Sequence, residues 1–175
     1  MANKTGLYVI AASSFKKMAD YAVSLFQPLF FAANFPNNSS EFIFANAFYY
    51  LVPTTIGAVV GGYLSDKYEK KNYWSKAIIC STFNFIAAPF CAKALLDGEN
   101  TFWMTVFYVS MQWFFDSMWI SPSIVMLQNT TSTKNQGSAV SIFYLATTMA
   151  GIVSTGFLGY VQGHINGAAH PELYG

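Results

Sequence analysis

Apolar residues are grouped along this chain into long stretches that are separated by short polar segments. A helix that crosses the hydrocarbon core of a bilayer needs roughly 20 mostly apolar residues. Helices are expected rather than strands, because lipid offers no hydrogen-bond partner to an open sheet edge. The pattern therefore predicts an all-α membrane protein, a multi-pass helical bundle. The predicted spans cover residues 7–31, 42–64, 73–95, 102–127 and 138–161.

Breaks and close packing are expected within these spans. The pair Gly57-x-x-x-Gly61 in the second span gives a small face against which another helix can approach closely. Proline removes a backbone hydrogen bond and permits a kink. The prolines inside predicted spans are Pro28, Pro53, Pro89 and Pro122.

The composition agrees with a membrane environment and excludes several functions. Only 10% of the residues are charged and 54% are hydrophobic, whereas about a quarter of a typical soluble domain is charged. A net charge of +1 leaves no basic face for nucleic acid, so membrane lipid is the expected partner. His164 and His170 lack metal-ligand spacing, and no phosphate-binding glycine loop or hydrolytic triad is present in the sequence. We therefore predict no metal, no cofactor and no enzymatic activity.

The distribution of lysine predicts the orientation. Three of the nine lysines lie in the 65–72 loop, and a short basic loop between spans is retained on the cytoplasmic side. That placement also puts the N-terminus and the loop after the fourth span in the cytoplasm, and these contain Lys4 and Lys134. The other two connectors contain acidic residues and no lysine. We expect a cytoplasmic N-terminus and a cytoplasmic 65–72 loop.

The same loop contains an ordered motif. It reads Gly62-x-Leu64-x-Asp66-Lys67-x-x-Lys70-Lys71. This resembles the loop signature of the major facilitator superfamily of transporters, Gly-x-Leu-x-Asp-(Arg/Lys)-x-Gly-(Arg/Lys)-(Arg/Lys), with Glu69 in place of the second glycine. The resemblance implies a loop that steadies one conformation of a transport cycle. The alternative is a generic positive-inside loop, which would lack the acid within the basic cluster.

Physical roles can be assigned to the motif residues. Gly62 allows a close helix approach. Asp66, at a helix end, can accept hydrogen bonds from the free N–H groups of a neighbouring helix. The lysines attract the anionic inner leaflet. Glu69 tolerates a positive φ poorly, which argues against a tight turn at that position.

The resemblance also implies an incomplete transporter. Superfamily members have two halves of six spans, so the chain resembles half of a 12-helix fold. In this superfamily the copy of the motif in the second half is often degenerate, so the chain resembles the C-terminal half, spans seven to eleven. Its general layout resembles the sugar-phosphate-like and spinster-like branches. Residues 162–175 form a polar tail, and we expect a fragment truncated before a sixth helix. Movement of a small-molecule solute would then require the missing N-terminal half or self-association.

Ionisable residues inside the predicted spans are the candidate site, because charges in lipid are costly and usually functional. At a rise of about 1.5 Å per residue, Lys16 and Asp20 lie about 13 and 20 Å from Leu7, and Asp116 lies about 16 Å from Leu127. These depths are similar, and the resemblance places the corresponding spans beside a central cavity. The predicted substrate or proton pathway comprises Lys16, Lys17, Asp20, Gln112, Asp116 and Trp119.

Alternatives remain open from the sequence. Lys16 and Lys17 have the spacing of an intrahelical ion pair with Asp20, which would neutralise these charges without any transport role. That interpretation suits a non-transporting membrane scaffold or regulatory subunit. A channel would instead require rings of like charge from several subunits. We favour a secondary-active transporter that works by alternating access, with Asp116 as the candidate proton-binding group.

Overall fold

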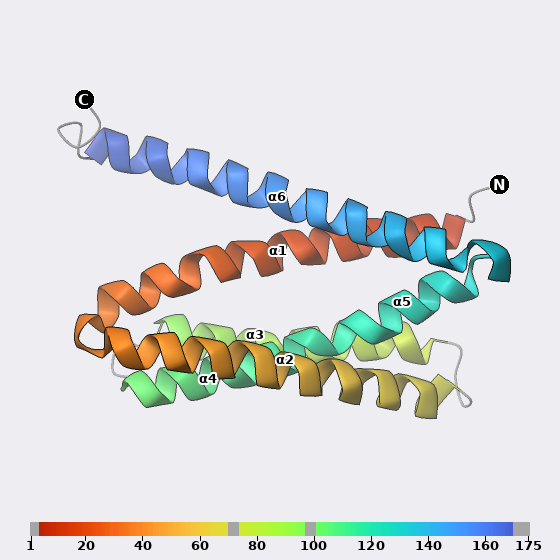
Figure 1. Ribbon diagram of the computed structural model, residues 1–175, viewed down its shortest axis with the longest axis horizontal. Helices are drawn as coiled ribbons and strands as arrows, with labels where there is room; N and C mark the ends of the chain where they lie inside the picture. The colour runs from red at the N-terminus through yellow and green to blue at the C-terminus, as the bar shows by residue number, and fades with distance from the viewer. Residues whose placement is uncertain (1–3, 70–73, 97–100, 170–175) are drawn as a thin grey trace. The chain divides into compact units, whose positions relative to one another are not determined.

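The computed structural model describes residues 4–69, 74–96 and 101–169, and within these ranges every secondary-structure element is a helix (Figure 1). The all-α prediction is therefore confirmed. In chain order the elements are α1 (Lys4–Asn34), η1 (Pro36–Asn38), α2 (Ser39–Glu69), α3 (Ser75–Leu96), α4 (Phe102–Asp116), η2 (Ser117–Trp119), α5 (Ile120–Asn129), η3 (Thr133–Asn135) and α6 (Gln136–Ala169).

Within the described part of the chain, three helical segments are long and apolar enough to cross a membrane by length and composition. They are Ser40–Glu69, Ser75–Leu96 and Thr133–His164. They correspond to the second, third and fifth predicted spans. The first predicted span lies in α1, whose middle carries Lys16, Lys17 and Asp20. The fourth is divided between α4 and α5 by η2, so that membrane crossing by these two segments stays a prediction.

Two helices extend past the predicted ends of their spans. α2 continues to Glu69, so the described part of the predicted 65–72 loop is helical, and α6 continues to Ala169, inside the predicted polar tail. Hydropathy detects the lipid core of about 30 Å, whereas the 31 residues of α2 span about 46 Å at the helical rise. A helix of this length is longer than the lipid core and can continue past the apolar stretch that hydropathy detects. Lys70 and Lys71 lie outside the described residues.

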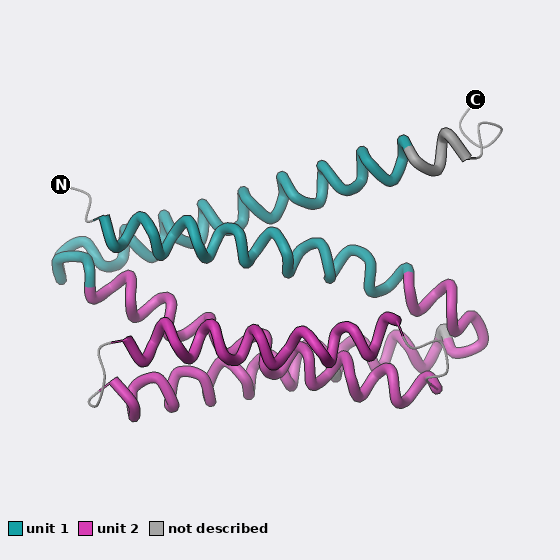
Figure 2. The backbone as a smooth tube through the Cα atoms, turned by 180° about the vertical axis from the view of Figure 1, so that it is seen from behind, with its two compact units in different colours: residues 1–29, 130–175 teal, residues 30–129 magenta. Residues whose placement is uncertain are grey.

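The chain forms two compact units (Figure 2). The first contains residues 1–29 and 130–175, and the second contains residues 30–129. In the second unit α2 and α3 each pack against α4, η2 and α5. In the first unit α6 contacts α1.

The glycine pair of α2 fixes the second unit. Gly57 lies against the carbonyl of Phe114, and a Cβ atom added at Gly61 would lie 2.7 Å from the Cα of Met118. Ser121 donates a hydrogen bond to the carbonyl of Ala58 at 2.9 Å. Because the backbones approach this closely, only glycine fits at these two positions of α2. The small face predicted from Gly57 and Gly61 contacts α4 and η2.

The break between α4 and α5 follows from Pro122 together with Gly61. Pro122 has no N–H group, so the carbonyl four residues earlier, that of Met118, loses its helical partner. That carbonyl lies against Gly61, where a side chain would exclude it. α1, α2 and α3 each contain a proline and stay continuous. A proline therefore accompanies a break where a neighbouring glycine accommodates the displaced carbonyl.

In the first unit, small residues of α6 hold the middle of α1. The hydroxyl of Ser154 donates a hydrogen bond to the carbonyl of Met18 at 3.0 Å. A Cβ atom at Gly151 would lie 2.7 Å from the ring of Tyr21. Met18 and Tyr21 flank Asp20 in the sequence, so these contacts fix the backbone that presents the Asp20 carboxylate.

Candidate functional site

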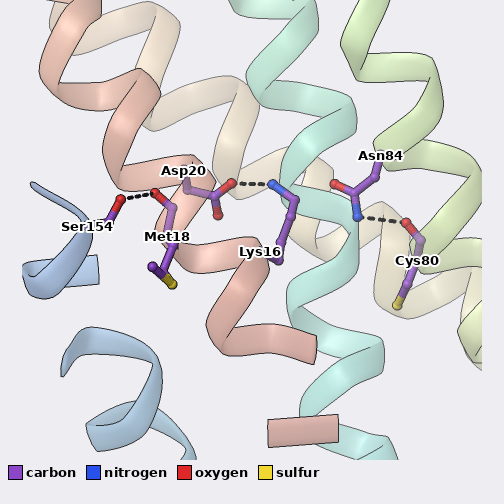
Figure 3. Close-up of polar contacts among 6 residues, drawn as sticks. All are labelled: Lys16, Met18, Asp20, Cys80, Asn84 and Ser154. Atoms are coloured by element: carbon purple, nitrogen blue, oxygen red, sulfur yellow. Dashed lines mark hydrogen bonds and ion pairs between the residues drawn. The ribbon is translucent and has the colours of Figure 1, made fainter. Parts of the chain in front are cut away.

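The charged residues of α1 form a local pair. Lys16 and Asp20 point toward each other on one helix and form an ion pair (Figure 3). The side chain of Asp20 is 8% exposed and that of Lys16 is 21% exposed. The ammonium of Lys17 lies 5.8 Å from the centroid of the Tyr21 ring, a cation–π distance. The structure thus shows the intrahelical pairing that the sequence left as an alternative. Burial of such a pair costs desolvation free energy, so stability alone explains it poorly.

A second polar group lies where α4 ends. Gln112 is 5% exposed, and its Oε1 atom has no hydrogen-bond partner among the described residues. Asp116 follows one helical turn later as the last residue of α4, and η2 begins at the next residue. A short 3₁₀ stretch between two α-helical segments often marks a hinge or a functional site. The break therefore marks the second unit's candidate site.

Aromatic side chains around Asp116 pack between helices. The ring of Phe115 stacks on Phe83 and Phe90 of α3, with centroids 6.2 and 5.6 Å apart. Trp113 contacts Tyr50 of α2 edge to face at 5.0 Å. Trp119, a predicted pathway residue, is 5% exposed. These rings pack α4 and η2 against α2 and α3 and thereby fix the backbone on either side of Asp116.

The structure brings the predicted pathway residues together in two groups. Lys16, Lys17 and Asp20 lie in the first unit, and Gln112, Asp116 and Trp119 lie in the second. Within each group the residues are close because they share one helix or adjoining helical turns.

Two polar residues of the second unit were missed from the sequence. Thr54 of α2 and Asn84 of α3 each have a buried side-chain oxygen without a hydrogen-bond partner among the described residues. The amide nitrogen of Asn84 donates to the carbonyl of Cys80 at 2.8 Å (Figure 3). Their sequence signal was a neutral polar residue inside an apolar span. Such a residue is a candidate functional group, because burial of an unpaired polar group is costly.

The motif residues of the described chain lie at the end of α2. A Cβ atom at Gly62 would lie 3.2 Å from the Cβ of Ser121, and Leu64 is half-buried. Asp66 is exposed, and its carboxylate accepts a hydrogen bond of 3.5 Å from Ser65. Lys67 lies 5.9 Å from the ring of Tyr63. The motif thus begins as the final turns of a helix.

An ion pair at this end was also missed from the sequence. Lys76 is 4% exposed, and its Nζ atom lies 2.5 Å from Oε1 of Glu69. The signal was available, because Glu69 departs from the superfamily motif and Lys76 begins an apolar stretch.

An open apolar groove of about 430 Å³ lies between α2 and α4. Three aromatic rings, those of Phe44, Phe48 and Trp103, form much of its wall. Its polar residue, Ser110, donates its hydroxyl hydrogen to the carbonyl of Val106. None of the predicted site residues in the described ranges lines it. The groove therefore offers hydrocarbon contact and no site for the predicted chemistry.

Long apolar helices with buried ionisable groups define an integral multi-pass membrane protein. Residues 9–166 match the Major Facilitator Superfamily, and the chain belongs to that family. No curated protein and no solved structure matches the chain. The resemblance drawn from the motif is confirmed. Members of this superfamily are generally transporters rather than enzymes. Family membership therefore supports a function in the membrane transport of small solutes.

Proposed function

We propose that the chain is the C-terminal bundle of a secondary-active transporter that moves a small solute by alternating access. Family membership over residues 9–166 supports a transporter. The motif at the end of α2 supports the C-terminal half, because Glu69 replaces the second glycine of the pattern. The general layout supports a sugar-phosphate-like or spinster-like branch.

The observation that carries this proposal is the helix break beside Asp116. Transporters build solute and ion sites near the bilayer midplane, and a short 3₁₀ stretch within a helical segment often marks a functional hinge. Here a carboxylate ends one helix, and the buried Gln112 one turn earlier has an oxygen without a hydrogen-bond partner among the described residues. An amide oxygen in this state can accept a hydrogen bond from a solute. Asp116 is the proposed proton-binding group, and Gln112 the proposed solute ligand.

The charges of α1 form the second part of the proposed pathway. Asp20 is buried and paired with Lys16, and contacts from α6 fix the backbone on either side. A carboxylate held so firmly can exchange its ammonium partner for a solute group without a change in backbone. Trp119 and Lys17 complete the pathway as residues that border these groups.

The proposed transport unit contains a second bundle. Alternating access requires two bundles that rock about a shared site. The second bundle would be an N-terminal half or a second copy of this chain. The motif residues Asp66, Lys67, Lys70 and Lys71 would steady one conformation of this pair.

Replacement of Gln112 with leucine tests the solute site. Removing a buried amide whose oxygen is unpaired is expected to leave the thermal unfolding midpoint unchanged or raise it. Solute uptake by proteoliposomes that contain the complete transporter should nevertheless fall. Gln136, half-buried at the start of α6 and outside the proposed pathway, gives the matched Gln→Leu control, with uptake expected to stay near wild type. Full uptake by Gln112→Leu would exclude a solute contact at this residue.

The proposed orientation places the N-terminus and the motif in the cytoplasm. Single cysteines at the exposed residues Asn37 and Lys134, each in a Cys80→Ala, Cys91→Ala background, test it by reaction with a membrane-impermeant maleimide. The Asn37 position should react in intact cells, and the Lys134 position only after permeabilisation. The reverse pattern would refute the orientation.

A non-transporting scaffold is the second candidate function. The ion pair of Lys16 with Asp20 supports it, since charges neutralised within one helix need no solute. A scaffold predicts that substitution at Asp116 leaves the cell's solute uptake intact, the opposite of the result expected for a carrier.

A further inference from the structure

The ends of three helices meet in a small polar cluster in the second unit, which we name the Glu69 junction. It consists of Glu69 at the end of α2, Lys76 at the start of α3 and Asn129 at the end of α5. The Nζ atom of Lys76 lies 2.5 Å from Oε1 of Glu69. The amide of Asn129 donates to the same oxygen at 3.5 Å. One carboxylate oxygen thus links three helix ends.

A backbone contact reinforces the junction. The hydroxyl of Ser75 donates to the carbonyl of Tyr68 at 2.9 Å. Tyr68 and Ser75 are the neighbours of Glu69 and Lys76 in the sequence, so two adjacent contacts connect α2 with α3. They join the two helices on either side of the short segment that contains Lys70 and Lys71.

The two partners of the ion pair are buried to very different degrees. The side chain of Lys76 is 5% exposed, and that of Glu69 is 44% exposed. A buried ammonium is costly without a paired anion, whereas a carboxylate half in water keeps much of its hydration. Burial of Lys76 therefore depends on the Glu69 carboxylate. Glu69 depends less on Lys76, because its carboxylate is hydrated.

Glu69 stands where the superfamily motif has a glycine. No described residue has a positive φ, so Glu69 continues the helix of α2 instead of making the turn that a glycine would permit. The helical conformation directs its side chain to α3 and α5. The substitution thus replaces a turn with a link between helices.

We propose that Glu69 and Lys76 are positioning residues that hold the ends of α2, α3 and α5 together as one rigid junction. Its role in the transport cycle rests on the function proposed above. The junction itself requires only the three helices of the second unit.

Hydrogen–deuterium exchange of the complete protein in lipid nanodiscs tests the junction without any solute. In Glu69→Gln, amides in the last turn of α2 and the second turn of α3 should exchange about tenfold faster, because Lys76 loses its anion. The double variant Glu69→Gln, Lys76→Met should return toward the wild-type rate, since the buried charge is gone. Glu41→Gln, an exposed glutamate in the first turn of the same helix, is the matched control and should leave the junction unchanged.

The charge-reversed variant Glu69→Lys, Lys76→Glu separates a specific pair from general helix stability. Slow amide exchange in this variant, together with fast exchange in each single reversal, would support a specific ion pair between residues 69 and 76. Exchange in Glu69→Gln at the wild-type rate would overturn the proposal, as would a fast-exchanging double variant. Absence of transport with the junction intact would refute the proposed function and leave this inference standing.

Discussion

Replacement of Asp116 with asparagine is expected to abolish proton-driven accumulation of solute by the complete transporter. Asparagine has nearly the shape of aspartate but takes up no proton. For a neutral solute moved with one proton, a potential of about 100 mV supplies about 2.3 kcal/mol, which corresponds to about a 50-fold solute gradient. The asparagine variant should reach no more than equal concentrations on the two sides. Proteoliposomes with an imposed potential and pH difference would measure this.

A matched control separates loss of coupling from loss of folding. Glu41→Gln removes a carboxylate from the exposed first turn of α2 and should retain wild-type accumulation. The thermal midpoint of Asp116→Asn should stay close to wild type, because an amide can keep hydrogen bonds that a carboxylate makes. Undiminished accumulation by Asp116→Asn would exclude this residue as the proton site and would favour the scaffold interpretation.

Replacement of Gly61 with alanine is expected to destabilise the protein by about 1–3 kcal/mol, the usual cost of overpacking. The new Cβ atom would lie 2.7 Å from the Cα of Met118 and close to the Met118 carbonyl. Both are backbone atoms, so no side chain can rotate away. The unfolding midpoint in detergent should fall, and uptake should fall with it because η2 must shift away from α2.

Gly156→Ala provides a control of opposite sign. Gly156 of α6 has nothing within 4 Å of its Cβ position, and alanine in a helix interior is favoured over glycine by about 1 kcal/mol. This variant should unfold at the same or a higher temperature. Equal effects of the two substitutions would show that α2 does not depend on contact at Gly61.

The helix break illustrates where prediction from sequence failed. Four prolines lie in the predicted spans, and by sequence each permits a kink. Only Pro122 accompanies an interruption in the described residues. The deciding atom belongs to another helix, because the Met118 carbonyl displaced by Pro122 occupies the space left by the missing side chain of Gly61. A contact between residues 57 positions apart in the chain has no signal in either local sequence.

The charges of α1 illustrate where prediction succeeded in part. The spacing of Lys16 and Asp20 permits an ion pair, and the structure contains it. The same spacing gives no information on burial, which depends on how α1 packs against other helices; α6 contacts α1 at Met18 and Tyr21, beside Asp20. Lys76 was missed for the same reason. Its burial depends on Glu69, at the end of the preceding helix, and the two lie together only because α2 and α3 are adjacent.

The sequence by itself determined that this protein is a bundle of membrane helices and that its family is the Major Facilitator Superfamily, and it predicted ionisable residues within the spans. These properties follow from hydropathy, motif spacing and helical rise, which are local along the chain. Only the tertiary structure decided where α2 and α6 end, which proline interrupts a helix and which charges are paired. Those outcomes depend on contacts between helices, since a freed carbonyl or a buried ammonium is stable only where another segment supplies space or an opposite charge.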